Sequence, residues 1–170
     1  MARKTFFYSL LMCVLGLLPL QAQKRAAALD PGKEIIGRIQ VELIYATNGD
    51  VALAGGDGRN LSPAEIADIK KFKDLHFQSY RLVGGDQQPI LRSYENWLAP
   101  LKPSQHILLS FEPRRRFEPD RLQLDLEYWQ GKRKLLKTDP ILRPGKPLYM
   151  LGPNWRGGRL IIKVRITKLN

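Results

Sequence analysis

The chain has 170 residues, a formal net charge of +12 and a single cysteine. This length fits one domain that can bury a sizeable core. A lone cysteine excludes a disulfide framework, cysteine-ligated zinc and iron–sulfur clusters, which all need several cysteines.

Residues 1–22 have the pattern of an export signal peptide. Basic residues precede an apolar run from Phe6 to Leu20, and Ala22 suits the position before a signal-peptidase cut. We expect cleavage near Ala22, which also removes Cys13, and a mature protein in the periplasm or outside the cell. Its stability then rests on packing without disulfides. Nucleic acid is not expected among its partners.

Two alternatives exist for this segment. A retained anchor needs roughly 20 apolar residues, whereas the run here has about 15 and contains Pro19 near its end. A lipoprotein would carry its lipid on Cys13, but Met12 is large for the preceding position and most of the apolar run follows the cysteine. Cleavage is therefore favoured over both.

Residues 23–37 are expected to form a flexible tether, and residues 38–170 a single β-sandwich domain. From Ile39 to Tyr45, apolar and polar side chains alternate as in a half-buried strand. Asn48-Gly49 follows and predicts a tight hairpin turn, because glycine and asparagine tolerate positive φ angles. Val51–Leu53 is the expected short return strand.

A helix is predicted over Ser62–Asp74. Ser62 and Glu65 have the spacing of a capping box, and Pro63 fits the first helical position. The apolar stripe of this helix is Ile66, Ile69 and Phe72. Its charged residues are expected to face water.

The rest of the chain has strand patterns separated by glycine and proline turns. The expected strands are His76–Val83, Pro89–Tyr94, His106–Phe111, Leu122–Trp129, Lys134–Thr138, Pro147–Leu151 and Leu160–Thr167. One-sided alternation within them is typical of antiparallel sheets with one solvated face. We expect a mainly β fold, an antiparallel β-sandwich of about 7–9 strands. The helix is inserted after the first hairpin and packs over a sheet edge or open end.

No catalytic, cofactor or metal site is predicted. Gly56 and Gly58 stand before the helix as in a dinucleotide-binding turn, but Leu61 occupies the place of the third glycine. Asp50 and Asp57 could ligate calcium, although their spacing fits no twelve-residue calcium loop. The two histidines, His76 and His106, are far apart and lack an acidic partner at a recognisable spacing.

The positive charge of the mature chain is concentrated in its C-terminal part. Residues 23–101 contain ten basic and ten acidic residues, a net of zero, whereas residues 102–170 contain sixteen basic and six acidic residues, a net of +10. Such a surface favours anionic partners. The candidate partner-binding residues are Arg114, Arg115, Arg116, Lys132, Arg133, Lys134, Trp155, Arg156, Arg159, Lys163 and Arg165. The basic clusters and the last strand are expected to contribute to one positive surface.

The tryptophans offer a second interpretation. Trp129 precedes a basic turn, and Trp155 lies in a glycine-rich segment with two arginines. An indole beside guanidinium groups can stack on a sugar ring while the cations bind an acidic group. Trp155 can also fold back as a lid over the open end of the sandwich, the favoured expectation. Trp97 is expected in the core.

These observations predict an exported, non-catalytic binding or assembly module of a bacterial-type cell envelope. Its basic C-terminal half is expected to bind an envelope protein or an anionic surface: a lipid headgroup, lipopolysaccharide or an acidic glycan. The alternative is a carbohydrate-binding module, or a degenerate carbohydrate-active domain, that uses Trp155 and Trp129. Asp125 and Glu127 share a strand face, but regular alternation already explains their spacing.

Overall fold

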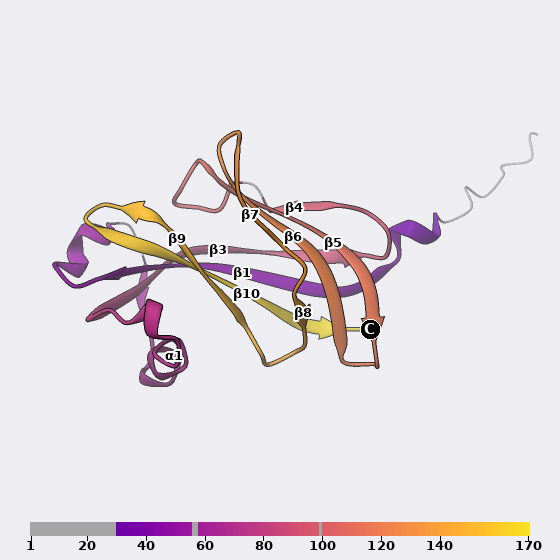
Figure 1. The fold of residues 1–170 in the computed structure, drawn as a ribbon, viewed down its shortest axis with the longest axis horizontal. Helices are drawn as coiled ribbons and strands as arrows, with labels where there is room; N and C mark the ends of the chain where they lie inside the picture. Colours follow the sequence, from indigo (N-terminus) through magenta and orange to yellow (C-terminus); the bar gives the residue numbers. More distant parts are fainter. Residues whose placement is uncertain (1–29, 56–57, 99) are drawn as a thin grey trace, which may run out of the picture.

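A computed structural model describes residues 30–55, 58–98 and 100–170, which form two antiparallel sheets packed face to face (Figure 1). The strands are β1 (Ile35–Thr47), β2 (Arg59–Asn60), β3 (Ser79–Leu91), β4 (Asn96–Leu98), β5 (Ile107–Phe117), β6 (Arg121–Gln130), β7 (Arg133–Thr138), β8 (Ile141–Leu142), β9 (Leu148–Trp155) and β10 (Gly158–Leu169). One sheet has the order β2-β3-β1-β10-β9 and the other β4-β5-β6-β7, with β8 paired to β6. The predicted mainly β sandwich is confirmed.

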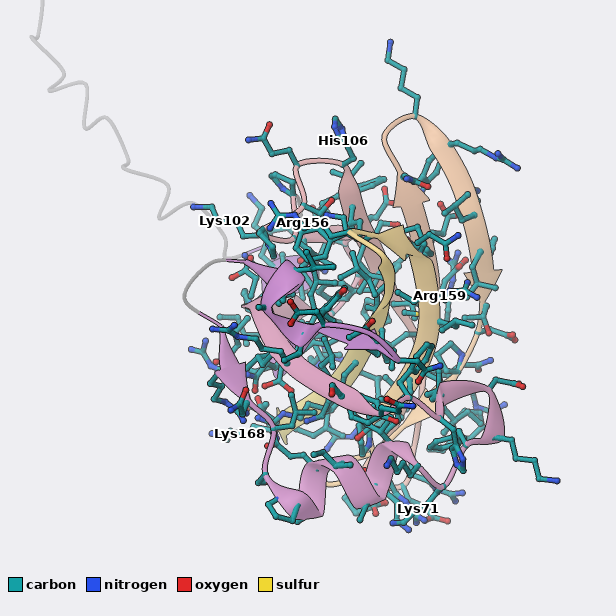
Figure 2. The ribbon with its side chains drawn as sticks, turned by 90° about the vertical axis from the view of Figure 1, so that its left-hand side faces the viewer. Lys71, Lys102, His106, Arg156, Arg159 and Lys168 are labelled. Carbon is teal, nitrogen blue, oxygen red and sulfur yellow. The ribbon has the colours of Figure 1, made fainter. Side chains whose placement is uncertain are left out.

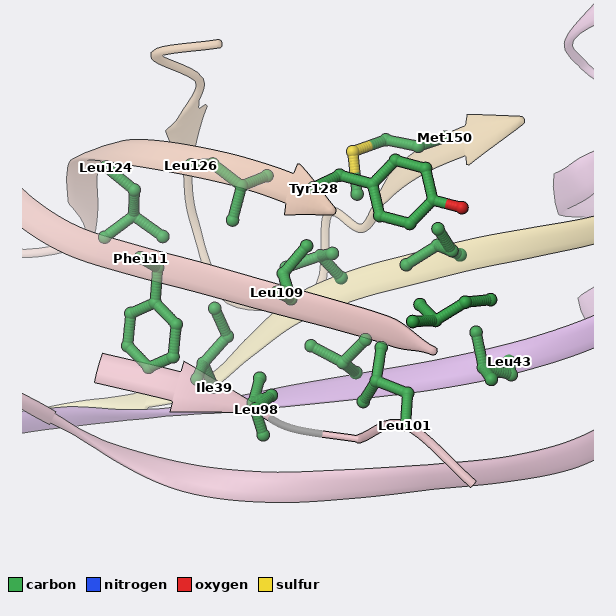
Figure 3. Packing of buried hydrophobic residues seen from close by; sticks show 14 of the residues in the cluster. Ile39, Leu43, Leu98, Leu101, Leu109, Phe111, Leu124, Leu126, Tyr128 and Met150 are labelled. Atoms are coloured by element: carbon green, nitrogen blue, oxygen red, sulfur yellow. The ribbon is translucent and has the colours of Figure 1, made fainter. Parts of the chain in front are cut away.

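The core lies between the two sheets and follows from alternation. The odd-numbered residues of β1 from Ile39 to Tyr45 point inward, as do the even-numbered residues of β6 from Leu122 to Tyr128. Figure 3 shows Leu124, Leu126 and Tyr128 pointing from β6 toward the layer that contains Ile39. Burial of these side chains is the main stabilising contribution in a sandwich of this kind.

The predicted first hairpin is wrong. Val51–Ala54 forms a 3₁₀ helix, and the Asp50 carboxylate accepts a hydrogen bond from the Ala52 N–H at its start. Strand β1 pairs instead with β3 on one side and β10 on the other, so it is the centre of its sheet. Long-range pairing in the sheet thus replaced the local turn that Asn48-Gly49 indicated.

The two strands expected around Gly84-Gly85 are one continuous strand, β3. A Cβ atom on Gly84 would lie 1.8 Å from the Lys102 carbonyl oxygen, and one on Gly85 would lie 2.6 Å from that of Val41. These glycines therefore admit neighbouring backbone within a strand and do not form a turn. The register of β3 against β1 shifts at the same place, between Leu43 and Ile44.

The helix is shorter than predicted and packs on a different surface of the sandwich from the one expected. Helix α1 spans Pro63–Ile69 with the expected capping box at Ser62, and a 3₁₀ helix covers Lys73–Leu75. The chain bends between them, so Phe72 is exposed and is not part of the buried stripe. Ile69 packs on the outer face of the β1–β10 sheet, against Ile44 and Ile161, rather than over an edge or open end.

Several boundaries differ because proline and glycine sit inside strands. Strand β5 continues through Pro113, next to a register shift, and β9 continues through Gly152-Pro153. The short strands β2, β4 and β8 have no counterpart among the strands expected from the sequence. The described part of the expected tether contains a 3₁₀ helix, Pro31–Lys33, and the beginning of β1.

Residues 1–22 and Asp57 lie outside the described residues, so the expected signal peptide and Asp57 have no structural counterpart here. Among the residues that are described, no helix is both long enough and apolar enough to cross a membrane.

Candidate binding surface

The two outer faces of the sandwich differ. Helix α1 lies on the outer face of the β1–β10 sheet, whereas the outer face of the β4–β7 sheet carries no helix of the described chain (Figure 1). We call this second surface the open face. Alternation along β6 places Gln123, Asp125, Glu127 and Trp129 on it, opposite to the buried leucines.

Two tryptophans meet on the open face. Trp97 in β4 lies opposite Ser110 of β5. Ser110 lies opposite Glu127 of β6, and Trp129 is two residues further along β6. Their ring centroids are 6.0 Å apart with planes inclined at 48°. Trp97 is 44 % exposed, and Trp129 is half-buried. The expectation that Trp97 belongs to the core is therefore wrong.

Trp129 is held in place by polar neighbours. Its Nε1–H donates to Glu127 Oε2 over 3.1 Å, and Lys134 Nζ lies 5.0 Å from the ring centroid. Lys134 in turn donates to Glu127 Oε1 over 2.7 Å. One face of the Trp129 ring is thus occupied by a cation. The Trp97 ring is therefore the more exposed aromatic surface, and the Trp129 ring lies beside it in a position fixed by these contacts.

Beside the tryptophans lies a block of alternating charge. Arg114 binds Glu112 at 3.2 Å and Asp125 at 2.9 Å, and Lys137 binds Asp125 at 3.0 Å and Glu127 at 3.2 Å. The block, including Lys134, thus contains three cations and three carboxylates: Arg114, Lys134 and Lys137, and Glu112, Asp125 and Glu127. The charges therefore balance within this block, and the excess positive charge expected from the sequence does not lie in it.

The carboxyl groups here are held ionised. Hydrogen bonds from Arg114 and then Lys137 lower the pKa of Asp125, and hydrogen bonds from Lys134 and Lys137 lower the pKa of Glu127. A general acid in glycoside hydrolysis needs a raised pKa instead. In the described part of the chain, no group of three or more His, Cys, Asp or Glu side chains is arranged to hold a metal ion.

The predicted arginine cluster on β5 is divided among different contacts. Arg114 belongs to the charged block of the open face. Arg115 lies opposite Gln123 in the β5–β6 register, on the same face, and its guanidinium is 4.7 Å from the centre of the Phe117 ring. Arg116 donates to the backbone oxygens of Asn170 and Pro119. Only Arg114 of the three thus lies in the charged block.

The second predicted cluster lies at the β6–β7 turn. Lys134 belongs to the open face, where it pairs with Glu127. Lys132 and Arg133 are exposed, and within the described residues neither forms an ion pair. These two cations are therefore available to a partner.

Trp155, Arg156 and Arg159 lie in or next to the β9–β10 turn, at one end of the sandwich, and line one cavity. Figure 2 views the molecule from this end and labels Arg156 and Arg159. The Trp155 ring packs edge-on against the core residue Tyr45, with centroids 5.7 Å apart. Arg156 covers its other side at 4.3 Å and donates to the Ala54 carbonyl oxygen. Trp155 is thus a lid on the core, as favoured from the sequence, and not an open platform.

Arg159 lies beside this lid and donates to the Gly152 carbonyl oxygen over 3.0 Å. Together with Trp155 and Arg156 it lines a cavity of about 540 Å³. The structure therefore brings these three predicted residues to one place, at the β9–β10 end of the sandwich.

Lys163 and Arg165 lie on the opposite outer face. Lys163 is buried and binds Glu42 over 2.8 Å, directly across the β1–β10 pair, while Arg165 donates to Gln40. Both line a groove of about 830 Å³ next to α1. The expectation of a single positive surface is wrong, because the outer faces of a sandwich point in opposite directions.

Sequence reasoning missed Trp97, although a signal was present. Trp97 and Leu98 are adjacent in a strand, so they point to opposite faces and only one of them can enter the core. Leu98 is the fully buried one.

Comparison of the chain with protein-family models, with curated proteins and with solved structures finds no match in any of the three. The interpretation of the open face therefore rests on its own geometry.

Proposed function

We propose that the protein is an exported, non-catalytic binding module and that its open face binds carbohydrate. The observation that carries the proposal is the exposure of Trp97, in contact with Trp129, on a sheet face that no described helix covers. Contact between the apolar surface of a tryptophan and water is unfavourable, and a ligand or partner that covers this surface removes that cost. A role in ligand binding gives that exposure a purpose.

A sugar ring suits this surface for two reasons. Its C–H face is apolar and stacks on an indole, while its hydroxyl groups need hydrogen-bonding partners at the edge. The open face offers both: the Trp97 ring, and the exposed side chains of Arg114, Lys134 and Lys137 beside it. Their ion pairs orient these cations before a ligand arrives, which reduces the entropy lost on binding.

The charge balance of the block beside the tryptophans favours a neutral saccharide. The three cations and three carboxylates of this block cancel, so an acidic glycan gains little net attraction from the block. The inclination of 48° between the two indoles also means that both rings cannot lie flat on one planar surface. A single, twisted glycan chain therefore fits better than a crystalline face. The ionised carboxylates of Asp125 and Glu127 favour binding over hydrolysis.

Affinity electrophoresis tests the proposal. The gels contain soluble neutral polysaccharides, such as hydroxyethylcellulose, glucomannan and galactomannan. We expect at least one of these gels to retard the mature protein. Trp97→Ala is expected to abolish this retardation, and Trp129→Ala to weaken it, because the ring beside Trp97 is lost. Phe72→Ala removes an exposed aromatic side chain on the opposite outer face and serves as the matched control.

Thermal melts of all variants show whether they remain folded. Retardation that survives in Trp97→Ala would contradict the proposal, as would a lack of retardation in every neutral gel. Retardation only in alginate or polygalacturonate would show that charge, and not ring stacking, drives binding.

A further inference from the structure

Strand β7 is the open edge of its sheet. The order β4-β5-β6-β7 ends with it, and within the described chain its outer side has no strand partner. Every residue from Arg133 to Lys137 is exposed. Figure 2 shows the β6–β7 hairpin, in orange, along one border of the molecule. An edge of this kind presents unpaired backbone N–H and C=O groups to solvent.

The side chains of β7 are unusual for an unprotected edge. Leu135 and Leu136 are 38 % and 39 % exposed, so the strand offers apolar surface next to its free backbone groups. Edge strands with exposed apolar residues readily pair with another strand. This strand therefore has both components that β-strand addition uses: main-chain hydrogen-bonding groups for affinity and apolar contacts for side chains.

The positive charges at the ends of β7 determine which kind of strand can pair with this edge. Lys132 and Arg133 lie at one end of β7 without an ion pair among the described residues, and Lys137 lies near the other end. A second copy pairing along the same edge would bring cations against cations, which opposes self-association. A segment with carboxylates would instead gain attraction at Lys132 and Arg133, since Lys137 is already paired with Asp125 and Glu127.

We propose that β7 binds an extended, acidic segment of a partner protein, which adds to the sheet as a further strand. Its carboxylates contact Lys132 and Arg133, and its apolar side chains contact Leu135 and Leu136. This interaction uses the edge of the sheet and is independent of saccharide binding on the open face. It also gives the basic β6–β7 turn a defined partner chemistry.

Three synthetic peptides test the proposal on the mature protein labelled with ¹⁵N. The first alternates glutamate and valine, the second alternates lysine and valine, and the third keeps the glutamates but has proline in place of the valines. Only the first peptide can both pair as a strand and meet the charge requirement. We expect it alone to shift the amide resonances of β7 and to slow hydrogen exchange of alternate β7 amides.

Charge-reversal variants provide the second measurement. Lys132→Glu with Arg133→Glu is expected to weaken binding of the glutamate–valine peptide by about tenfold at low salt, because two exposed charge pairs are lost. Lys73→Glu with Lys168→Glu makes the same change in net charge away from β7 and is expected to leave binding unchanged. Trp97→Ala is also expected to leave it unchanged.

Several results would overturn the proposal. Equal binding of the proline peptide would show attraction to charge without strand pairing. Equal loss in the two charge-reversal variants would show a dependence on net charge alone. Binding to phosphatidylglycerol vesicles, together with no binding of the glutamate–valine peptide, would identify β7 as a lipid-contacting edge instead.

Discussion

At the scale of single residues, the same type of side chain has opposite roles on the two outer faces. Lys134 and Lys137 are exposed and orient carboxylates on the open face. Lys163 and Glu42 form a buried pair, with side chains 9 % and 8 % exposed. Removing two charges from water costs several kcal/mol, and their attraction only offsets this cost when the geometry is good.

Substitution of Lys163 tests this pair. Lys163→Met leaves the Glu42 carboxylate buried without its cation, so we expect a loss of about 3–5 kcal/mol in the free energy of unfolding. Glu42→Met combined with Lys163→Met is expected to be close to neutral or stabilising, because no unpaired charge remains. Urea denaturation measures both, with Lys168→Met as the exposed control. A double variant less stable than Lys163→Met would contradict this account.

At the scale of single elements, alternation explains β6 best. Its leucines and Tyr128 face the core, and its polar residues form the centre of the open face. Strands β3 and β5 are harder to predict, because a glycine pair or a proline inside them resembles a turn. In both cases, a register shift in the neighbouring pairing accommodates the residue.

The register of β6 is tested by two adjacent substitutions. Leu124→Ala removes a fully buried side chain and is expected to reduce the free energy of unfolding by about 2–5 kcal/mol. Gln123→Ala changes the solvent-facing side of the same strand and is expected to cost less than about 0.5 kcal/mol. Chemical denaturation compares the two. Similar losses in both variants would show that the register is wrong.

At the scale of the whole molecule, acid is expected to reduce stability. Hydrogen bonds from Arg59 lower the pKa of Glu65 from 4.5 to about 2, while burial opposes this shift. Asp68, Asp125 and Glu127 also have lowered pKa values because cations bind them. At pH values between the folded-state pKa and the unfolded-state pKa of these carboxyl groups, the folded state thus binds fewer protons than the unfolded state.

The direction of the pH dependence of stability follows from this difference in bound protons. Stability from Glu65 is fully present above about pH 5 and is lost as the pH falls from about 4.5 toward 2. Thermal melting across this range should show a falling melting temperature. Glu65→Gln is expected to be less stable than the wild type at neutral pH and to have a shallower acid dependence. An identical pH dependence in both proteins would exclude a contribution from Glu65.

The sequence by itself determined the fold class, the helix start at Ser62 and the inward face of β6, because these depend on local patterns. Capping needs residues three apart, and the faces of a strand alternate with a period of two. The same patterns fixed Asp125 and Glu127 on a common face. Local signals were sufficient for each of these features.

Only the tertiary structure decided how the strands associate and which charges meet. Residues 102–170 contribute strands to both sheets, so their basic side chains are divided between opposite faces although they are close in sequence. Lys163 finds Glu42 across 121 residues of chain, and Trp97 meets Trp129 across another strand. Such contacts depend on long-range pairing and register, which hydrophobic periodicity does not encode.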